Sequence, residues 1–256
     1  MSLPEAVAIV AAGMAASTVN TIVGSGSLIT FPTLLAFGFA PVVANVTNTV
    51  GLAPGSLSGA IGYRRELVGQ RARAVRLGVA AGLGGLTGGI LLLLLPASAF
   101  ERVVPWLILL AATLVALQPR LARAMAHRHV LGAAPSAPLV AGVYLTATYG
   151  GYFGAAQSVI LIALLAIMLP DDLQRLNALK NVLTVLVGGV AAALFILLPL
   201  VRDVPGPAWD AAVLLAVGGV IGGQIGAALG RRIPQGVLRG VIVLVGYAVG
   251  TRLLIG

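Results

Sequence analysis

Eight long apolar stretches, separated by short polar segments, dominate the sequence. They cover residues 5–38, 41–62, 77–96, 103–118, 138–169, 173–200, 209–230 and 237–256. Their apolar residues are continuous rather than alternating, which favours helices over the strands of a membrane β-barrel. At roughly 20 residues per crossing, the chain has room for about six to eight crossings. The pattern predicts an all-α, polytopic membrane protein in which residues 1–256 form a single membrane domain.

The composition agrees with this class and excludes others. Hydrophobic residues make up 59% of the 256 residues and charged residues 9%, against roughly 45–50% and 25% in soluble domains. A soluble enzyme, a disordered chain and a coiled coil are therefore excluded. The chain has no cysteine, which excludes disulfides, iron–sulfur clusters and Cys-based zinc sites. The first ten residues contain no basic residue, so we expect no cleaved signal peptide.

Two of the apolar stretches are interrupted by small residues. The first breaks at Gly24-Ser25-Gly26-Ser27, and the fifth breaks around residues 150–158, where Gln157 and Ser158 follow a glycine-rich run. Glycine and serine free the backbone from a continuous helix. Each interrupted stretch is therefore predicted to form two half-helices, with new helices beginning near Ser27 and Ser158.

The sequence also repeats landmarks in the same order and at nearly the same spacing. Gly84-Gly85 and Gly88-Gly89 recur in the second half as Gly218-Gly219 and Gly222-Gly223. The segment that contains Asn45 and Asn48 is echoed by the segment from Asn177 to Asn181, and the two breaks are separated by a similar length of chain. This spacing suggests a duplication into a first repeat, 1–125, and a second repeat, 126–256. Chance pairing of glycines is the alternative.

Arginines in the loops predict the orientation. The loops 63–76, 119–137 and 231–239 hold five, three and three arginines. Because basic loops stay on the cytoplasmic side, we expect all three inside, and the segments 97–102 and 201–210 outside. This topological role, together with contact to anionic lipid, explains the net charge of +9 better than nucleic-acid binding does.

Two topologies remain open. If all eight stretches cross the bilayer, the basic loop 231–239 falls outside and violates the charge rule. If the two interrupted stretches are re-entrant hairpins, each repeat crosses three times, the second repeat is inverted, and all three basic loops lie inside. We favour the hairpins, although residues 5–23 alone are nearly long enough to cross, at about 1.5 Å per residue.

A single lysine is the most unusual charge in the sequence. Lys180 lies inside the stretch 173–200, whereas all seven acidic residues lie at the ends of stretches or in loops. A charge inside a membrane helix costs roughly 2.5–3.5 kcal/mol and commonly marks a substrate path or an ion pair. A bound anion would supply the missing partner. The alternative is that Lys180 extends to the interface near Asp171 or Asp172.

Neutral hydrogen-bonding residues accompany the lysine in the sequence. Buried amides need partners, which are either each other or a ligand, and the starts of helices present free N–H groups to anions. Together these features predict a substrate-binding site for an anion. The candidate residues are Lys180, Asn181, Asn177, Asn48, Asn45, Ser25, Gly26, Ser27, Gln157 and Ser158.

Other kinds of site fit the sequence less well. The segment Gly24-Ser25-Gly26-Ser27 lacks the ending of a phosphate-binding loop, and a serine nucleophile needs a base. His127 and His129 are the only histidines and are two ligands short of a zinc site, so we interpret them as solvated loop residues. The glycine pairs at spacing four predict close-packing helix contacts.

The same residues carry a family resemblance. The runs 24–35, 41–50 and 54–66, followed by Tyr149–Gly154 and Asn177–Asn181, closely resemble the signatures of the TauE/SafE family of sulfite exporters. The resemblance covers both halves of the chain, but Ala156 and Ser158 stand where the family usually has more glycine. It implies a bacterial inner-membrane permease for sulfite, sulfoacetate or related sulfur-containing organic anions.

The function that we predict is transport of a small anion by a multi-pass protein of the inner membrane. Sulfite, a related oxyanion and an organosulfonate are the expected substrates, moved by alternating access around a midplane site. No cofactor, catalytic residue, metal site or nucleic-acid partner is expected. The lipid bilayer is the expected surrounding, and the glycine-rich helices allow a homo-oligomer. The alternative is a structural or partner-binding membrane subunit without transport activity.

Overall fold

The computed structural model describes residues 2–125, 135–229 and 235–255, which fold into helices joined by short turns. The predicted all-α, polytopic membrane architecture is confirmed. His127 and His129 lie outside the described residues. The α-helices are α1 Leu3–Ile22, α2 Ser27–Ala36, α3 Pro41–Gly62, α4 Arg71–Leu94, α5 Ala97–Met125, α6 Ala137–Tyr152, α7 Gln157–Met168, α8 Leu173–Leu197, α9 Trp209–Leu229 and α10 Gln235–Ile255.

The ends of the helices follow local chemistry. Ser2 and Glu5 form a capping box at the start of α1, in which the Ser2 amide donates to the Glu5 carboxylate at 2.8 Å. The Asp172 side chain caps α8 by accepting from the Gln174 amide at 2.8 Å. The predicted breaks are confirmed, because α2 begins at Ser27 and α7 begins at Gln157.

Two helices are longer than their apolar stretches. The stretch predicted over 77–96 lies in α4, which already begins at Arg71, and the stretch over 103–118 lies in α5, which runs from Ala97 to Met125. Arginine is a good helix former, so the helices continue past the residues that hydropathy marks. Hydropathy therefore outlines the part suited to the membrane rather than the whole helix.

Six helices among the described residues are long and apolar enough to cross a membrane: α1, α4, α5, α8, α9 and α10. This set differs in one member from that of the hairpin topology, which counted the stretch 41–62 as a crossing and the stretch 5–38 as a hairpin. The 20-residue α1 qualifies because its apolar run is unbroken. The helix α3 does not, since asparagine, threonine, serine and glycine lower its hydropathy.

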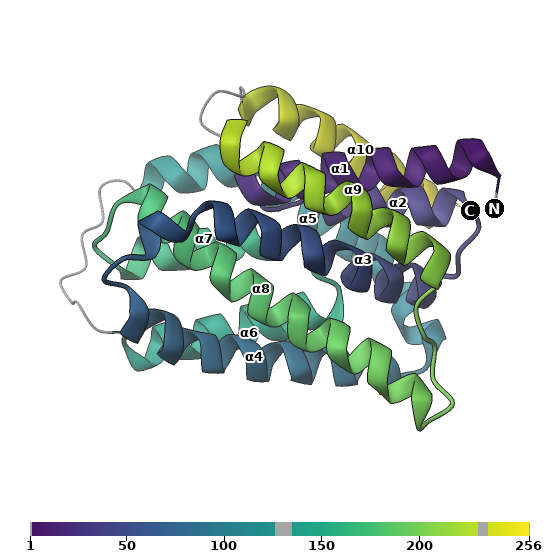
Figure 1. Ribbon diagram of the computed structural model, residues 1–256, viewed down its shortest axis with the longest axis horizontal. Helices are drawn as coiled ribbons and strands as arrows, with labels where there is room; N and C mark the ends of the chain where they lie inside the picture. Colours follow the sequence, from purple (N-terminus) through teal and green to yellow (C-terminus); the bar gives the residue numbers. More distant parts are fainter. Residues whose placement is uncertain (1, 126–134, 230–234, 256) are drawn as a thin grey trace.

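The path of the chain nevertheless forms two hairpins. Figure 1 shows that α1 starts and α2 ends at the same end of the molecule, and that α6 starts and α7 ends at the opposite end. Both hairpins turn inside the bundle, at residues 23–26 and 153–156. Gly24 adopts φ +93° and Gly154 φ +81°, a left-handed conformation that glycine reaches without strain.

The ends of the helices gather at two ends of the molecule. The end of α3 and the start of α4, the end of α5 and the start of α6, and the end of α9 and the start of α10 all lie toward the left of Figure 1. The connections from α4 to α5 and from α8 to α9 lie at the other end. The described helix ends that flank the three basic loops therefore lie at one end, as the hairpin topology requires. Which end faces the cytoplasm stays a prediction.

Each hairpin packs on a helix from the other half of the chain. The helix α1 lies along α9, and α6 lies along α4. In the centre α3 contacts α8, and α5 pairs with α10. Exchanging α1–α5 for α6–α10 maps the contact α1–α9 onto α6–α4 and maps α3–α8 and α5–α10 each onto itself, which is what an inverted duplication produces. The duplication itself stays a prediction.

Glycines allow the closest of these contacts. A Cβ on Gly88 would lie 2.0 Å from the Thr148 carbonyl oxygen of α6. A Cβ on Gly222 would lie 2.0 Å from the Met14 carbonyl oxygen of α1. Because no side chain fits such gaps, the backbones themselves touch, as small residues permit in membrane helices. These glycine faces are covered within the chain, so a homo-oligomer would need other surfaces.

The outer faces of the protein are apolar, and a group of polar side chains is buried within a core that is otherwise apolar. Large apolar side chains are exposed on the outer faces, among them Val79, Leu110 and Leu244. Buried polar side chains gather instead at α3, α8 and the hairpin turns, including Asn48 and Lys180. This is the arrangement expected when lipid is the surrounding solvent.

The glycine contacts predict that one added methyl group destabilises the protein at a tightly packed glycine and not at a glycine with open space beside it. We expect Gly88→Ala to lower the thermal unfolding midpoint of the detergent-solubilised protein by several degrees. Overpacking of this kind costs about 1–3 kcal/mol, and each kcal/mol shifts the midpoint by about 2–4 °C in a chain of this size. Gly189→Ala is the control, because no atom lies within 4 Å of its added Cβ. Equal midpoints for the two variants would contradict the close contact between α4 and α6.

Candidate functional site

Lys180 lies in the interior of the helix bundle. It is the eighth residue of α8, about 10 Å along the axis from the first residue at 1.5 Å per residue. Only 1% of its surface is exposed. The described residues provide no hydrogen-bond acceptor and no carboxylate for its ammonium group. The bundle thus encloses a positive charge to which the described part of the protein supplies no counter-charge.

The proposed interfacial partners of Lys180 are engaged elsewhere. The Asp171 carboxylate lies 2.7 Å from Arg73 of α4 and 2.8 Å from Arg175 of α8. Asp172 caps α8. Since Lys180 is buried and both carboxylates have other partners, the alternative that Lys180 extends to the interface near them is wrong.

The Asp171 cluster is a clasp between the two halves of the chain. Gln70 donates to the Arg175 carbonyl oxygen at 3.0 Å, and Arg175 donates to the Val68 carbonyl oxygen at 3.1 Å. Burial alone would raise the pKa of Asp171, but hydrogen bonds from the Asp172 amide, Arg175 and Arg73 outweigh it and hold that pKa below its usual value. The clasp joins the start of α4 to the start of α8.

Asn48 connects the first hairpin to α3. Its carbonyl oxygen accepts from the Thr30 hydroxyl, and its amide nitrogen donates to Ser27 Oγ at 3.2 Å. Both atoms of the amide therefore have partners on α2. Asn48 and Ser27 belong to the site region, but their contacts hold the hairpin against α3.

Asn45 connects α3 to the second hairpin. Its amide nitrogen donates to the Tyr152 carbonyl oxygen at 2.8 Å, at the last residue of α6. Its own carbonyl oxygen is buried and has no partner among the described residues. One half of this amide thus anchors the turn 153–156, and the other half is buried without a partner among the described residues.

The two hairpin turns meet beside α8. Ser158, the second residue of α7, shares a hydrogen bond of 3.1 Å with Thr184 of α8. A Cβ on Gly24, in the other turn, would lie 2.3 Å from the Ser158 Cβ. Thr184 is four residues after Lys180, so the two side chains lie on the same face of α8. These contacts bring the turns and the lysine into one region.

Several buried polar atoms in this region have no partner among the described residues. They are Ser25 Oγ, Gln157 Nε2, Asn181 Nδ2 and Asn45 Oδ1. Leaving such an atom unsatisfied costs about 1–3 kcal/mol, so a bound ligand that satisfies them would be stabilised. Asn177 is only half-buried and is the least enclosed of the predicted amides.

The starts of the short helices add backbone donors. The amides of Ser25, Gly26 and Ser27, and likewise those of Ala155, Ala156 and Ser158, donate to no carbonyl in the described part of the chain. Helix starts carry a partial positive charge in addition to these free N–H groups. Gly26 is buried against the Ala16 carbonyl oxygen, which brings the start of α2 close to α1.

Sequence reasoning missed residues that complete this region. Thr30 forms a hydrogen bond with Asn48, and Thr184 forms one with Ser158. Their position as threonines inside apolar stretches was the sequence signal by which they could have been found. An aromatic cluster also borders the second turn, with the rings of Phe31 and Phe153 5.4 Å apart. The only signal for that cluster was aromatic residues near the breaks.

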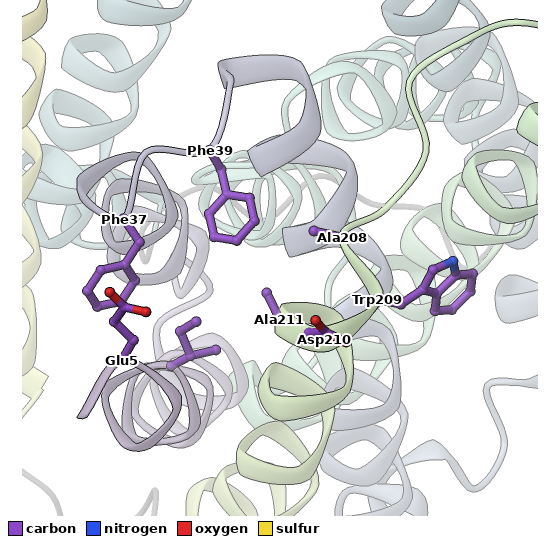
Figure 2. Close-up of a pocket in the computed structure, with 8 residues that line it drawn as sticks. Glu5, Phe37, Phe39, Ala208, Trp209, Asp210 and Ala211 are labelled. Carbon is purple, nitrogen blue, oxygen red and sulfur yellow. The ribbon is translucent and has the colours of Figure 1, made fainter. Parts of the chain in front are cut away.

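A separate cavity of about 380 Å³ lies at the end of the molecule where α1 starts and α2 ends. Figure 2 shows Glu5 and Phe37 on one side of it and Asp210 and Ala211 on the other, with Trp209 directed away. None of the ten predicted site residues lines it. Its carboxylates would repel an anion, so it is not the predicted anion site.

Comparison with known proteins settles the family. A family model described as sulfite exporter TauE/SafE matches residues 9–253. The chain belongs to the TauE/SafE family. With the six apolar helices, this membership makes it a multi-pass protein of the inner membrane, and the family and its relatives are transporters rather than enzymes.

Curated relatives in this family are similar over part of the chain. Identity to the probable membrane transporter protein YfcA of Escherichia coli K12 is 28% over 144 residues, covering 56% of this chain and 52% of that protein. Identity to a probable membrane transporter protein of Haemophilus influenzae is 31% over 115 residues, covering 43% of each. The chain thus spans about half the length of the curated relatives that it matches. No solved structure matches it.

The second turn holds a residue other than glycine in a left-handed conformation. Ala156 is fully buried and adopts φ +58°. The left-handed region disfavours residues with a Cβ by roughly 1–2 kcal/mol. The Tyr149 hydroxyl supports this turn by donating to the Ala155 carbonyl oxygen at 2.7 Å. The backbone amides at the start of α7 are therefore held in place despite the missing glycine.

The clasp predicts a pH-dependent contribution to stability. Because the folded state lowers the pKa of Asp171, the contribution is complete above the unfolded value of about 3.9 and is lost as the pH falls through the folded value. We expect Asp171→Asn to destabilise the solubilised protein at pH 7 by about 1 kcal/mol or less, since the group is partly exposed. The difference from the wild type should shrink below about pH 4.

Thermal unfolding across pH measures this effect, with Asp203→Asn as the control. Asp203 is exposed in the loop at the opposite end and forms no salt bridge to any described residue. A difference between Asp171→Asn and the wild type that stays constant down to pH 3 would contradict the assignment.

Proposed function

We propose that the protein transports a small anion, sulfite or a related sulfur-containing oxyanion or organosulfonate, by alternating access around the region where the hairpin turns meet. Lys180 supplies the positive charge. Its complete burial without a counter-charge among the described residues is the observation that carries the proposal. A small anion is the simplest ligand that can pair with this ammonium group and later dissociate from it.

The neutral groups in the region suit the same ligand. Asn181 and Gln157 offer buried amide donors, and Ser25 offers a hydroxyl. The free N–H groups at the starts of α2 and α7 add donors with partial positive charge. Sulfonate and sulfite oxygens accept several hydrogen bonds at once, so a cluster of donors around one cation fits them.

The arrangement of the helices supports a transport mechanism. Each hairpin packs on a helix of the opposite half, and broken helices that meet near the middle are common in inverted-repeat transporters. We infer that the repeats 1–125 and 126–256 rock against each other, so that the site opens alternately to each side. The clasp at Asp171 then closes the end at which α4 and α8 start.

The second candidate function is a membrane subunit that binds a partner without transporting anything. The glycine contacts favoured this reading in the sequence, but in the structure they are used between helices of the same chain. A buried cation without a partner has no role in such a subunit. Anion transport therefore accounts for more of the observed structure.

Replacement of the lysine separates transport from folding. We expect Lys180→Met, which keeps the length of the side chain, to abolish sulfite flux in proteoliposomes. Thermal stability should stay equal or rise, because the variant removes an uncompensated buried charge. Lys180→Arg keeps the charge in a bulkier, forked group, so partial flux is expected.

Arg202→Gln is the control for loss of one positive charge, since Arg202 is exposed in the loop between α8 and α9. Its flux should match the wild type. Normal sulfite flux by Lys180→Met would contradict the proposed role of the lysine. Loss of both flux and folding in Lys180→Met would instead indicate a structural role.

Orientation and hairpins can be tested together, because the chain has no cysteine. Leu3, Ala40 and Val68 are exposed near helix ends. Single cysteines at Leu3 and Ala40 should both react with a membrane-impermeant maleimide from outside, and one at Val68 should react only after lysis. Reaction of Leu3 and Ala40 from opposite sides would show that the first interrupted stretch crosses the membrane.

A further inference from the structure

One unpartnered atom in the site region can only accept a hydrogen bond. The ammonium of Lys180 and the unpartnered nitrogens of Gln157 and Asn181 are donors. The Asn45 carbonyl oxygen is an acceptor, and it too is buried without a partner in the described chain. Only 1% of the Asn45 surface is exposed. An acceptor in a cluster of donors constrains which ligand fits.

The orientation of the Asn45 amide is fixed by chemistry. Its other terminal atom lies 2.8 Å from the Tyr152 carbonyl oxygen, and a carbonyl oxygen can only accept a hydrogen bond. The atom that faces Tyr152 must therefore be the nitrogen. If the amide were flipped, two oxygens would face each other. The remaining oxygen is thus held away from Tyr152 as a fixed acceptor.

The position of this oxygen links it to the donors. Tyr152 ends α6 and leads directly into the turn that presents Gln157 and Ser158. Ser158 bonds to Thr184, which shares a helix face with Lys180. The contrast with Asn48 is informative, because both atoms of that amide already have partners on α2. Of the two α3 amides, Asn45 is the one with an atom left for a ligand.

A fully deprotonated oxyanion offers only acceptors, so its oxygens would face the lone pairs of Asn45 Oδ1 without a hydrogen between them. A monoanion that also carries an O–H or N–H group satisfies both ends of the site. We propose that the site selects such donor-bearing monoanions, with the acidic oxygens on Lys180 and the donor group on Asn45. This inference rests on the proposed anion transport and narrows its substrate class.

A matched pair of ligands tests the selection directly. The monoanions 2-hydroxyethanesulfonate and 1-propanesulfonate have the same charge and nearly the same size, and differ in one hydroxyl. Titration calorimetry on the purified wild-type protein should show tighter binding of the hydroxyl compound. The expected ratio of dissociation constants is roughly tenfold or more, because the apolar ligand leaves a buried acceptor unsatisfied.

Two variants test whether Asn45 causes the difference between the dissociation constants of the two sulfonates. Asn45→Leu removes the acceptor at similar volume, and its ratio should fall to near one. Asn20→Leu is the matched control, since Asn20 is a partly buried amide of the first hairpin that donates to Ser56 at 3.3 Å. Its ratio should stay at the wild-type value.

The outcomes distinguish this inference from the proposed function. Equal affinity of the wild type for the two sulfonates overturns the selection by Asn45 and leaves anion binding intact. An unchanged ratio in Asn45→Leu also overturns it. Binding of neither sulfonate by the wild type contradicts the proposed transport of organosulfonates as well. The wild-type comparison stands even if Asn45→Leu fails to fold.

Discussion

The proposed function of this structure depends above all on the buried ammonium group of Lys180. Placing a charge inside a membrane helix costs roughly 2.5–3.5 kcal/mol on insertion scales, and no described residue offers a carboxylate that would offset this cost. The nearest acidic groups along the chain, Asp171 and Asp172, are engaged in the clasp and in capping α8. A protein that keeps such a charge gains stability when a suitable anion binds.

The predicted duplication makes the two halves of the chain comparable position by position. Aligning Asn45 with Asn177 places Lys180 opposite Asn48. In the first half, Asn48 is satisfied by Ser27 and Thr30 of the adjacent hairpin. In the second half, aligning Ser27 with Ser158 places Leu161 opposite Thr30, and leucine offers no hydrogen bond. In this alignment the amide of the first half is hydrogen-bonded to its hairpin, whereas the lysine of the second half has no such partner among the described residues.

Much of this organisation was predictable because it depends on local sequence. Glycine and serine at residues 24–27 and around 150–158 predicted where the helices break, and both breaks occur there. The loop arginines predicted which helix ends lie together, and the described helix ends that flank those loops do lie at one end of the molecule. The isolated lysine predicted the centre of the proposed site in the same way.

The rest depends on contacts between distant segments. Asn45 and Tyr152 are 107 residues apart in sequence, and nothing local indicates that one amide atom is occupied while the other is open. The hydrogen bonds from Asn48 of α3 to Ser27 and Thr30 of α2 were missed for the same reason. The full-length α1 was underestimated because its break follows 20 mostly apolar or small residues instead of dividing the stretch evenly.

The presence of one lysine in the whole chain allows the central claim to be measured at a single atom. Protein labelled with 15N-lysine gives one side-chain nitrogen signal, from Lys180 Nζ, which can be followed by NMR in detergent micelles or nanodiscs during titration with sulfite. The account predicts a saturable change in the chemical shift of this signal, absent when chloride replaces sulfite at the same ionic strength. A folded, transport-active sample whose lysine signal does not change at saturating sulfite would contradict the claim that Lys180 binds the anion.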